Sequence, residues 1–212
     1  MAVVLCAVLA GIGIGVAWHL LLSPEHHVLA VTHRGNLDGQ ATWAPGTRPA
    51  PPITALRDQH GARFSLGSLH GHTVAIEFFD SHCHQACPLA GRALAASERL
   101  LPRAQRPVLV VVSINPLDTP ASTRAAVRAW GLAGLASWHW LRGTHAELAR
   151  VWSAYHIFVQ PMKGDIAHTE ALYLLDRRGD ERSGYLFPYA PDFVAHDLRV
   201  LAGTGSSAEH HA

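Results

Sequence analysis

The chain has 212 residues, a length that allows one compact domain with a short additional segment and excludes two full domains. Apolar residues make up 49% of it and charged residues only 16%, which excludes a disordered protein and favours a membrane segment or a well-buried sheet. The formal net charge is +1 and no long Lys/Arg run occurs, so we predict no nucleic-acid partner.

The chain begins with an apolar run over residues 1–22, in which Trp18 and His19 are the only polar or amphipathic breaks. About 20 such residues are enough to cross a bilayer as a helix. A cleaved signal peptide is the alternative, but no basic segment precedes the run and no small-x-small cleavage pattern ends it. We therefore predict an uncleaved transmembrane anchor, in which Cys6 behaves as a small apolar residue.

Residues 23–52 are rich in Gly, Pro, Thr and His, a composition that predicts an extended tether between the anchor and a folded domain at 53–203. Residues 204–212 are predicted to form a flexible tail. Several histidines fall in the tether and the tail, where solvated spacer is the preferred interpretation and weak metal binding is the alternative: His26, His27, His33, His210 and His211.

Strand and helix patterns alternate through the folded domain. Short apolar runs predict strands at 73–79, 107–114, 138–142, 170–176 and 184–187, with the last two forming a hairpin. Apolar residues at helical spacing predict helices at 88–101, 123–130, 145–156 and 191–201. The almost continuous Val and Leu run at 107–114 is typical of a central strand covered on both faces. Together these patterns predict an α/β fold, with a central mixed sheet flanked by helices.

Two cysteines, Cys83 and Cys87, lie where the first long strand is followed by a helix, a position that favours ionised thiols. On a regular helix their Cβ atoms would be about 5–6 Å apart, wider than the roughly 3.5–4.5 Å of a relaxed disulfide. A metal ion tolerates that gap, and two soft thiolates favour Cu(I). A disulfide remains open if Cys83 lies in the loop. A metal would need a third donor from elsewhere, most often an imidazole.

Two motifs together resemble the Sco/SenC family: Cys83-x-x-x-Cys87-Pro88, and the stretch HTEALYLLDRRG that begins at His168. The resemblance covers roughly residues 53–201 and implies a thioredoxin-like fold tethered by one transmembrane helix. It implies a copper ion, Cu(I) or Cu(II), held by Cys83, Cys87 and His168. The implied function is that of a metallochaperone, rather than an enzyme, which delivers copper for cytochrome c oxidase assembly.

The resemblance also implies a partner and a location. The partner would be the copper-bearing subunit of the oxidase or another copper protein. The location would be the bacterial inner (cytoplasmic) membrane, with the soluble domain facing the periplasm or the cell exterior. Three positions depart from the family pattern: His84 and Gln85 replace Pro and Asp after the first cysteine, and Asn115 stands where the family tends to have Asp. These changes affect groups around the proposed ligands, which tune a metal site.

Other interpretations of the same residues stay open. In a thiol-disulfide oxidoreductase, Cys83 would attack a partner disulfide and Cys87 would resolve the intermediate, keeping partner cysteines reduced. The two cysteines could instead form a structural disulfide. A peroxiredoxin-like peroxidase ranks last, because no Thr lies three residues before Cys83. His82 and His84 are secondary candidates for copper binding, and Met162 is interpreted as a packing residue.

Overall fold

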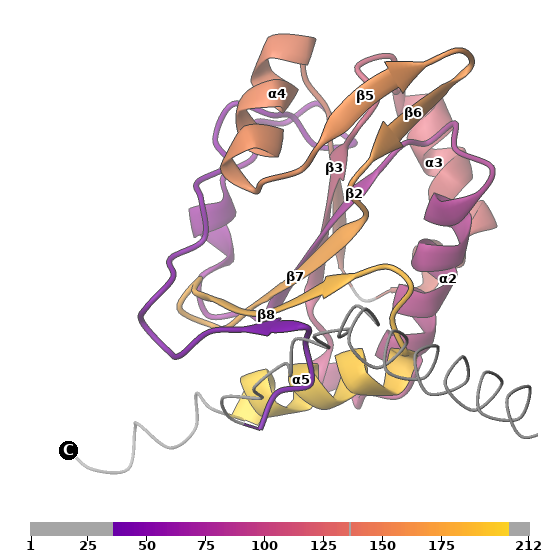
Figure 1. The fold of residues 1–212 in the computed structure, drawn as a ribbon. Coiled ribbons are helices and arrows are strands. Elements are labelled where there is room, and N and C mark those ends of the chain that lie inside the picture. The colour runs from indigo at the N-terminus through magenta and orange to yellow at the C-terminus, as the bar shows by residue number, and fades with distance from the viewer. Residues whose placement is uncertain (1–35, 136, 204–212) are drawn as a thin grey trace, which may run out of the picture. The chain divides into compact units, whose positions relative to one another are not determined.

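A six-stranded mixed sheet crosses the molecule in the order β1-β8-β7-β2-β3-β4 (Figure 1). The structure is a computed structural model that describes residues 36–135 and 137–203. Strands β2, β3 and β4 run parallel, whereas the β2–β7, β7–β8 and β1–β8 pairs are antiparallel. The six strands are β1 (Ala41–Thr42), β2 (Val74–Phe79), β3 (Val108–Ser113), β4 (Trp138–Leu141), β7 (Ala171–Leu175) and β8 (Glu181–Leu186). The prediction of an α/β fold with a mixed central sheet is confirmed.

Helices cover both faces of this sheet (Figure 1). They are α2 (Ala86–Arg99), α3 (Pro120–Ala129), α4 (His145–Ala154) and α5 (Pro191–Gly203), close to the four helical ranges predicted from the sequence. Strand β8 begins three residues earlier than the predicted second arm of the hairpin. A separate hairpin, β5 (Val159–Met162) and β6 (Asp165–His168), is not predicted, because its strands are short, have no fully buried residue and include a proline.

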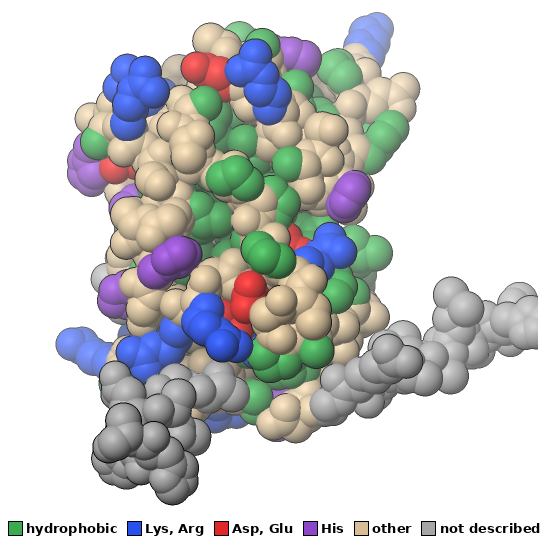
Figure 2. All heavy atoms as spheres, turned by 90° about the vertical axis from the view of Figure 1, so that its left-hand side faces the viewer, with side chains coloured by type: hydrophobic (Ala, Val, Ile, Leu, Met, Phe, Trp, Pro, Cys, Tyr) green, Lys and Arg blue, Asp and Glu red, His purple; other side chains and the backbone are tan. Residues whose placement is uncertain are grey.

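Two apolar cores result, one on each face of the sheet. Alternate residues of the buried strand β2 separate them: Ala75 and Phe79 face the core beneath α2, α3 and α5, whereas Ile76 and Phe78 face the core beneath α4. Figure 2 looks onto the side of the molecule that carries α4, where Lys and Arg side chains are scattered among apolar and His side chains. Burial on both faces explains the continuous Val and Leu run of β3.

Local signals in the sequence fix the starts of two helices. Thr119 accepts a hydrogen bond from the backbone N–H of Ser122 and begins α3, and Pro120 occupies its first turn. At the start of α4, the Thr144 hydroxyl accepts a hydrogen bond from the backbone N–H of Glu147. The Glu147 carboxylate in turn accepts one from the backbone N–H of Thr144. Helix α3 therefore starts directly after the loop that follows β3, and this loop borders the cysteine motif.

Part of the predicted tether belongs to the folded unit. Ala41 and Thr42 pair with Ser183 and Gly184 as strand β1 of the sheet. The buried Asp197 carboxylate of α5 also accepts hydrogen bonds from backbone N–H groups of the same segment, at residues 38 and 39. Ordered structure thus begins well before the predicted boundary at Ile53, because backbone pairing with β8 outweighs the extended, turn-rich composition of this segment.

The predicted transmembrane anchor at 1–22 and the predicted tail at 204–212 lie outside the described residues. Across 36–135 and 137–203, the structure contains no helix that is both long enough and apolar enough to cross a bilayer.

Candidate metal centre

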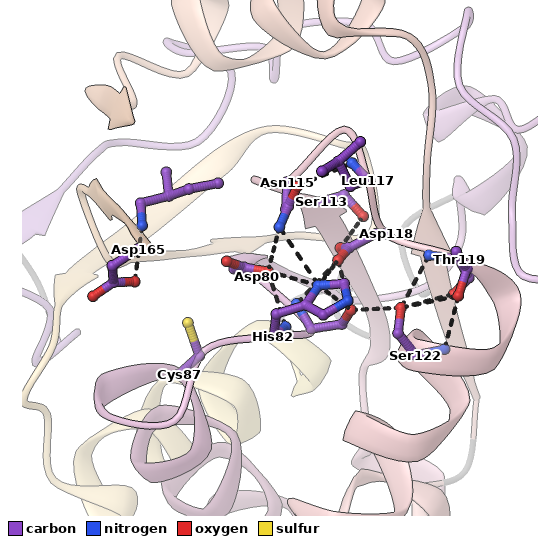
Figure 3. Close-up of polar contacts among 12 residues, drawn as sticks. Asp80, His82, Cys87, Ser113, Asn115, Leu117, Asp118, Thr119, Ser122 and Asp165 are labelled. Carbon is purple, nitrogen blue, oxygen red and sulfur yellow. Dashed lines mark hydrogen bonds and ion pairs between the residues drawn. The ribbon is translucent and has the colours of Figure 1, made fainter. Parts of the chain in front are cut away.

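The two cysteines occupy different positions at the end of β2. Helix α2 begins at Ala86, so Cys87 lies in its first turn, whereas Cys83 lies in the preceding loop. Cys87 is fully buried against the core and Cys83 is partly buried, and both are free thiols. In Figure 3 the Cys87 side chain points from the start of α2 toward the β5–β6 hairpin. The sequence prediction that the motif lies at a helix start is confirmed.

The pKa of the Cys83 thiol is lowered to about 6. The largest cause is a hydrogen bond from the Cys87 thiol, and backbone N–H groups of Gln85, Ala86 and Cys87 add to it, against the opposing effect of burial. Conversely, the pKa of Cys87 is raised by the same hydrogen bond and by burial. The pair therefore shares one proton at neutral pH, with the thiolate on the more accessible sulfur, Cys83.

His168 ends strand β6 and places its imidazole beside the buried cysteine. Its Nε2 lies 3.6 Å from Cys87 Sγ, and its side chain is only 4% exposed. The Nδ1 atom lies 3.1 Å from the carbonyl oxygen of Thr169, which can only accept, so Nδ1 carries the proton and donates. Burial lowers the pKa of His168. A neutral imidazole with its Nε2 lone pair facing a sulfur is the form that binds metals.

Glu170, which is not among the site residues predicted from the sequence, completes a cluster with Cys87 and His168. Its Oε1 lies 3.6 Å from Cys87 Sγ and 3.8 Å from His168 Nε2, and its side chain is 13% exposed. Burial raises the pKa of Glu170 to about 7, opposed by the hydrogen bond from Cys87 and reinforced by the charge of Cys83. One ligand atom each from Cys87, His168 and Glu170 lies within 4.8 Å of the other two. Cys83 stands beside this cluster and contacts it through Cys87.

A second polar cluster occupies the other side of the cysteine loop (Figure 3). Nδ1 of the half-exposed His82 lies 3.4 Å from an oxygen of Asp80 and 3.3 Å from one of Asp118. Asp118 also accepts hydrogen bonds from the Ser81 and Ser113 hydroxyls. In the described part of the chain, neither His82 nor His84 forms a hydrogen bond with a cysteine sulfur. The cluster therefore orders the loop that carries Cys83.

Asn115, one of the departures from the family pattern, belongs to this second cluster. Its Nδ2 donates to Asp80 Oδ1 at 3.1 Å, and its own oxygen accepts from the backbone N–H of Leu117. An aspartate at 115 would add a third carboxylate beside the buried Asp80 and Asp118, where the charges repel. The presence of Asp80 thus accounts physically for asparagine at this position.

The donor set can bind a soft or borderline transition metal. Two sulfurs and an unprotonated imidazole nitrogen are ligands that select copper or zinc over Mg²⁺ or Ca²⁺. One sulfur is already a thiolate at neutral pH, so metal binding would release mainly the proton of Cys87. Of the three residues predicted from the sequence, Cys87 and His168 lie together and Cys83 adjoins them through Cys87, and Glu170 adds an oxygen donor. Met162 is exposed at the far end of the hairpin and stays outside the cluster.

The chain was compared with known protein families and structures. The model of the SCO1/SenC family matches residues 54–203, most of the described domain. No curated protein matches the chain. Among solved structures, ScoI of Bradyrhizobium japonicum with copper bound is 27% identical, with a TM-score of 0.59, covering 72% of this chain and 99% of that one.

Two further structures show the same fold at lower identity. Yeast Sco1 with copper bound is 20% identical, with a TM-score of 0.61 and coverage of 77% of this chain and 92% of that one. BsSco, a member of the Sco family of cytochrome c oxidase assembly proteins in which a disulfide switch was identified, is 19% identical. Its TM-score is 0.63, with coverage of 76% of this chain and 98% of that one.

Proposed function

The chain belongs to the SCO1/SenC family, and from this premise we propose that it is a copper metallochaperone. It binds a copper ion through Cys83, Cys87 and His168 and passes it to a copper-bearing partner during cytochrome c oxidase assembly. The observation that carries the proposal is the 3.6 Å approach of His168 Nε2 to Cys87 Sγ, since the fold joins residues 81 positions apart. Copper-bound Sco structures from other organisms support the choice of metal.

The chemistry of loading and release follows from the state of each ligand. Cys83 is already a thiolate, and it is the more accessible sulfur, so it makes the first contact with an incoming ion. Cys87 then gives up its proton and His168 contributes its Nε2 lone pair without losing one. Release runs in the opposite order: a partner ligand replaces Cys83 first, and the two buried ligands exchange afterwards.

We also propose a membrane location for the protein. The apolar run at 1–22 anchors the chain in the bacterial inner membrane, and the folded domain faces the periplasm or the cell exterior. The partner is the copper-bearing subunit of the oxidase, because BsSco belongs to a family of cytochrome c oxidase assembly proteins. Direct transfer in such a place protects the ion from competing ligands in solution.

Thiol-disulfide exchange is the second candidate function, and the lowered pKa of Cys83 favours it. The Cys83 thiolate would attack a partner disulfide, forming a mixed disulfide and releasing one partner thiolate. Cys87, after losing its proton, would then attack Cys83 Sγ and release the second partner thiol. The partner gains two electrons and the Cys83–Cys87 pair is oxidised to a disulfide. Its loop position gives Cys83 the freedom that this bond requires.

Copper transfer is tested with the full-length reduced protein loaded with Cu(I). It is mixed with the oxidase subunit that carries copper in the assembled enzyme, prepared here without its metal. We expect copper to appear on the acceptor even when a chelator that captures all free Cu(I) is in excess, because ligand exchange occurs within a complex. The control is the same mixture with a metal-free acceptor of unrelated fold. If the chelator takes all the copper before the oxidase subunit does, the protein stores copper and does not deliver it.

A further inference from the structure

Glu170 stands in an unusual position for a carboxylate. It follows β6 by two residues and immediately precedes β7, so the extended chain directs its side chain to the same side as His168. Its Oε1 is within 4 Å of both Cys87 Sγ and His168 Nε2. Its backbone carbonyl accepts from Phe187 N–H, which fixes the residue against β8. The carboxylate is therefore held at the metal centre by the sheet and not by a mobile loop.

No basic residue neutralises this carboxylate in the described part of the chain. The neighbouring imidazole of His168 directs its Nδ1 proton to the Thr169 carbonyl and its unprotonated Nε2 toward the sulfur, so it brings no positive charge to the carboxylate. Glu170 Oε1 lies 3.6 Å from the Sγ atom of the fully buried Cys87, so the carboxylate and the sulfur meet in a largely buried place. A sulfur, an imidazole nitrogen and a carboxylate oxygen thus converge on one point, where a bound cation would contact all three.

We infer that Glu170 is a fourth metal ligand, an oxygen donor that adapts the centre to hold Cu(II) as well as Cu(I). The inference rests on the proposed copper site and adds one donor to it. The four atoms would be Cys83 Sγ, Cys87 Sγ, His168 Nε2 and Glu170 Oε1, of which the last three already lie within 4.8 Å of one another.

The added oxygen changes which copper ion the centre favours. Two thiolates and one imidazole suit the soft Cu(I) ion, which is satisfied by three donors of this kind. A carboxylate is a harder ligand and carries a negative charge, so it stabilises the divalent ion more than the monovalent one. With Glu170 bound, the ligands carry three negative charges, one from each sulfur and one from the carboxylate. The centre then resists reduction of Cu(II), and its reduction potential falls.

Glu170→Gln tests the assignment, since the amide keeps the size of the side chain and removes its charge. Copper affinity of the full-length protein is measured by chelator competition, separately for Cu(I) without oxygen and for Cu(II). We expect Cu(II) affinity to fall by at least about 10- to 100-fold, since this range for outer-shell partners is a lower bound for a direct ligand, with Cu(I) affinity almost unchanged. Each tenfold selective loss raises the Cu(II)/Cu(I) potential by about 59 mV. The electron paramagnetic resonance spectrum of bound Cu(II) changes with the lost oxygen.

The control is Asp165→Asn, which removes an exposed carboxylate from the other end of β6. It leaves Cu(II) affinity and spectrum as in the wild type if Glu170 acts by ligation. Equal losses in both variants would overturn the inference in favour of a general charge effect, and so would a Glu170→Gln protein with unchanged Cu(II) binding. If the glutamine variant folds poorly, the Cu(II) affinity of Glu170→Ala is measured in its place. A wild-type protein that binds no copper would overturn the proposed function as well.

Discussion

His168→Ala is expected to weaken copper binding at least 100-fold while the rate of thiol-disulfide exchange stays within about twofold of the wild type. The imidazole is a direct ligand in the proposed site, and its Nε2 faces Cys87 Sγ at 3.6 Å. Losing a direct ligand costs more than losing an outer-shell partner, for which the usual loss is about 10- to 100-fold. The exchange reaction depends on other groups, since the Cys83 pKa is set by Cys87, burial and the N–H groups of residues 85–87.

The two activities are measured on the same preparation, copper by chelator competition and exchange with a small aromatic disulfide. His60→Ala is the matched control, because it removes an exposed imidazole from the turn that begins at Asp58. Unchanged copper affinity in His168→Ala would remove His168 from the ligand set. Parallel loss of copper binding and exchange would mean that the imidazole supports the cysteine loop and has no separate role in the chaperone activity.

Glu77→Gln is expected to make the folded domain more stable at pH 8 by roughly 4 kcal/mol and to leave its stability at pH 4 almost unchanged. Glu77 lies in the middle of β2, fully buried, and burial raises its pKa from 4.5 to about 8. Its Oε1 has no hydrogen-bond partner, and the Tyr189 hydroxyl lies 3.1 Å from Oε2. A protonated Glu77 can donate to Tyr189, whose own proton then goes to the Ala90 carbonyl 3.3 Å away.

The sign of this effect follows from proton binding. Between pH 4.5 and about 8 the folded protein holds a proton on Glu77 that the unfolded chain has released, so the stability of the wild type falls as pH rises through this window. Below pH 4.5 both states are protonated and the contribution of Glu77 is constant. A glutamine amide can donate to Tyr189 at every pH, so it imitates the protonated acid and removes the dependence.

Urea unfolding of the two proteins between pH 4 and pH 8 measures the effect. Asp192→Asn is the control, since it neutralises an exposed carboxylate in the first turn of α5 and should not alter the slope between pH 4.5 and 8. A wild-type stability that stays level across this range, or a variant with the same slope as the wild type, would show that Glu77 is ionised in the folded protein. Its charge would then need a partner within the sheet.

The secondary structure of the central domain was largely predictable because apolar periodicity marks elements that are buried. The runs that became β2 and β3 are buried along their whole length, and α2 has an apolar face of the expected spacing. The same signal fails where an element is exposed. Strands β5 and β6 carry few buried side chains, so the sequence pattern does not predict their pairing. This pairing nevertheless positions His168, the last residue of β6. Strand β1 was missed because backbone pairing with β8 has no sequence pattern.

The metal centre was predictable in part for a similar reason. Cys83 and Cys87 are close in the chain, and a family motif marked His168, but only the fold shows that the imidazole reaches the buried sulfur. Glu170 was interpreted as a strand residue. Its spacing of two from His168 was an available signal, because residues two apart in an extended segment face the same side. Asp80 and Asn115 could not be paired from the sequence, since the loop after β3 brings them together.

The copper ligands are identified by X-ray absorption at the copper edge of the Cu(I)-loaded, full-length protein, with metal and protein quantified in the same sample. We expect a ratio of one copper per chain with two sulfur neighbours and an imidazole. In Cys83→Ser and in Cys87→Ser we expect one sulfur neighbour and the tight binding to be lost. Copper held without sulfur neighbours, or binding that survives in both serine variants, would place the metal elsewhere on the chain and contradict the assignment of Cys83, Cys87 and His168 as its ligands.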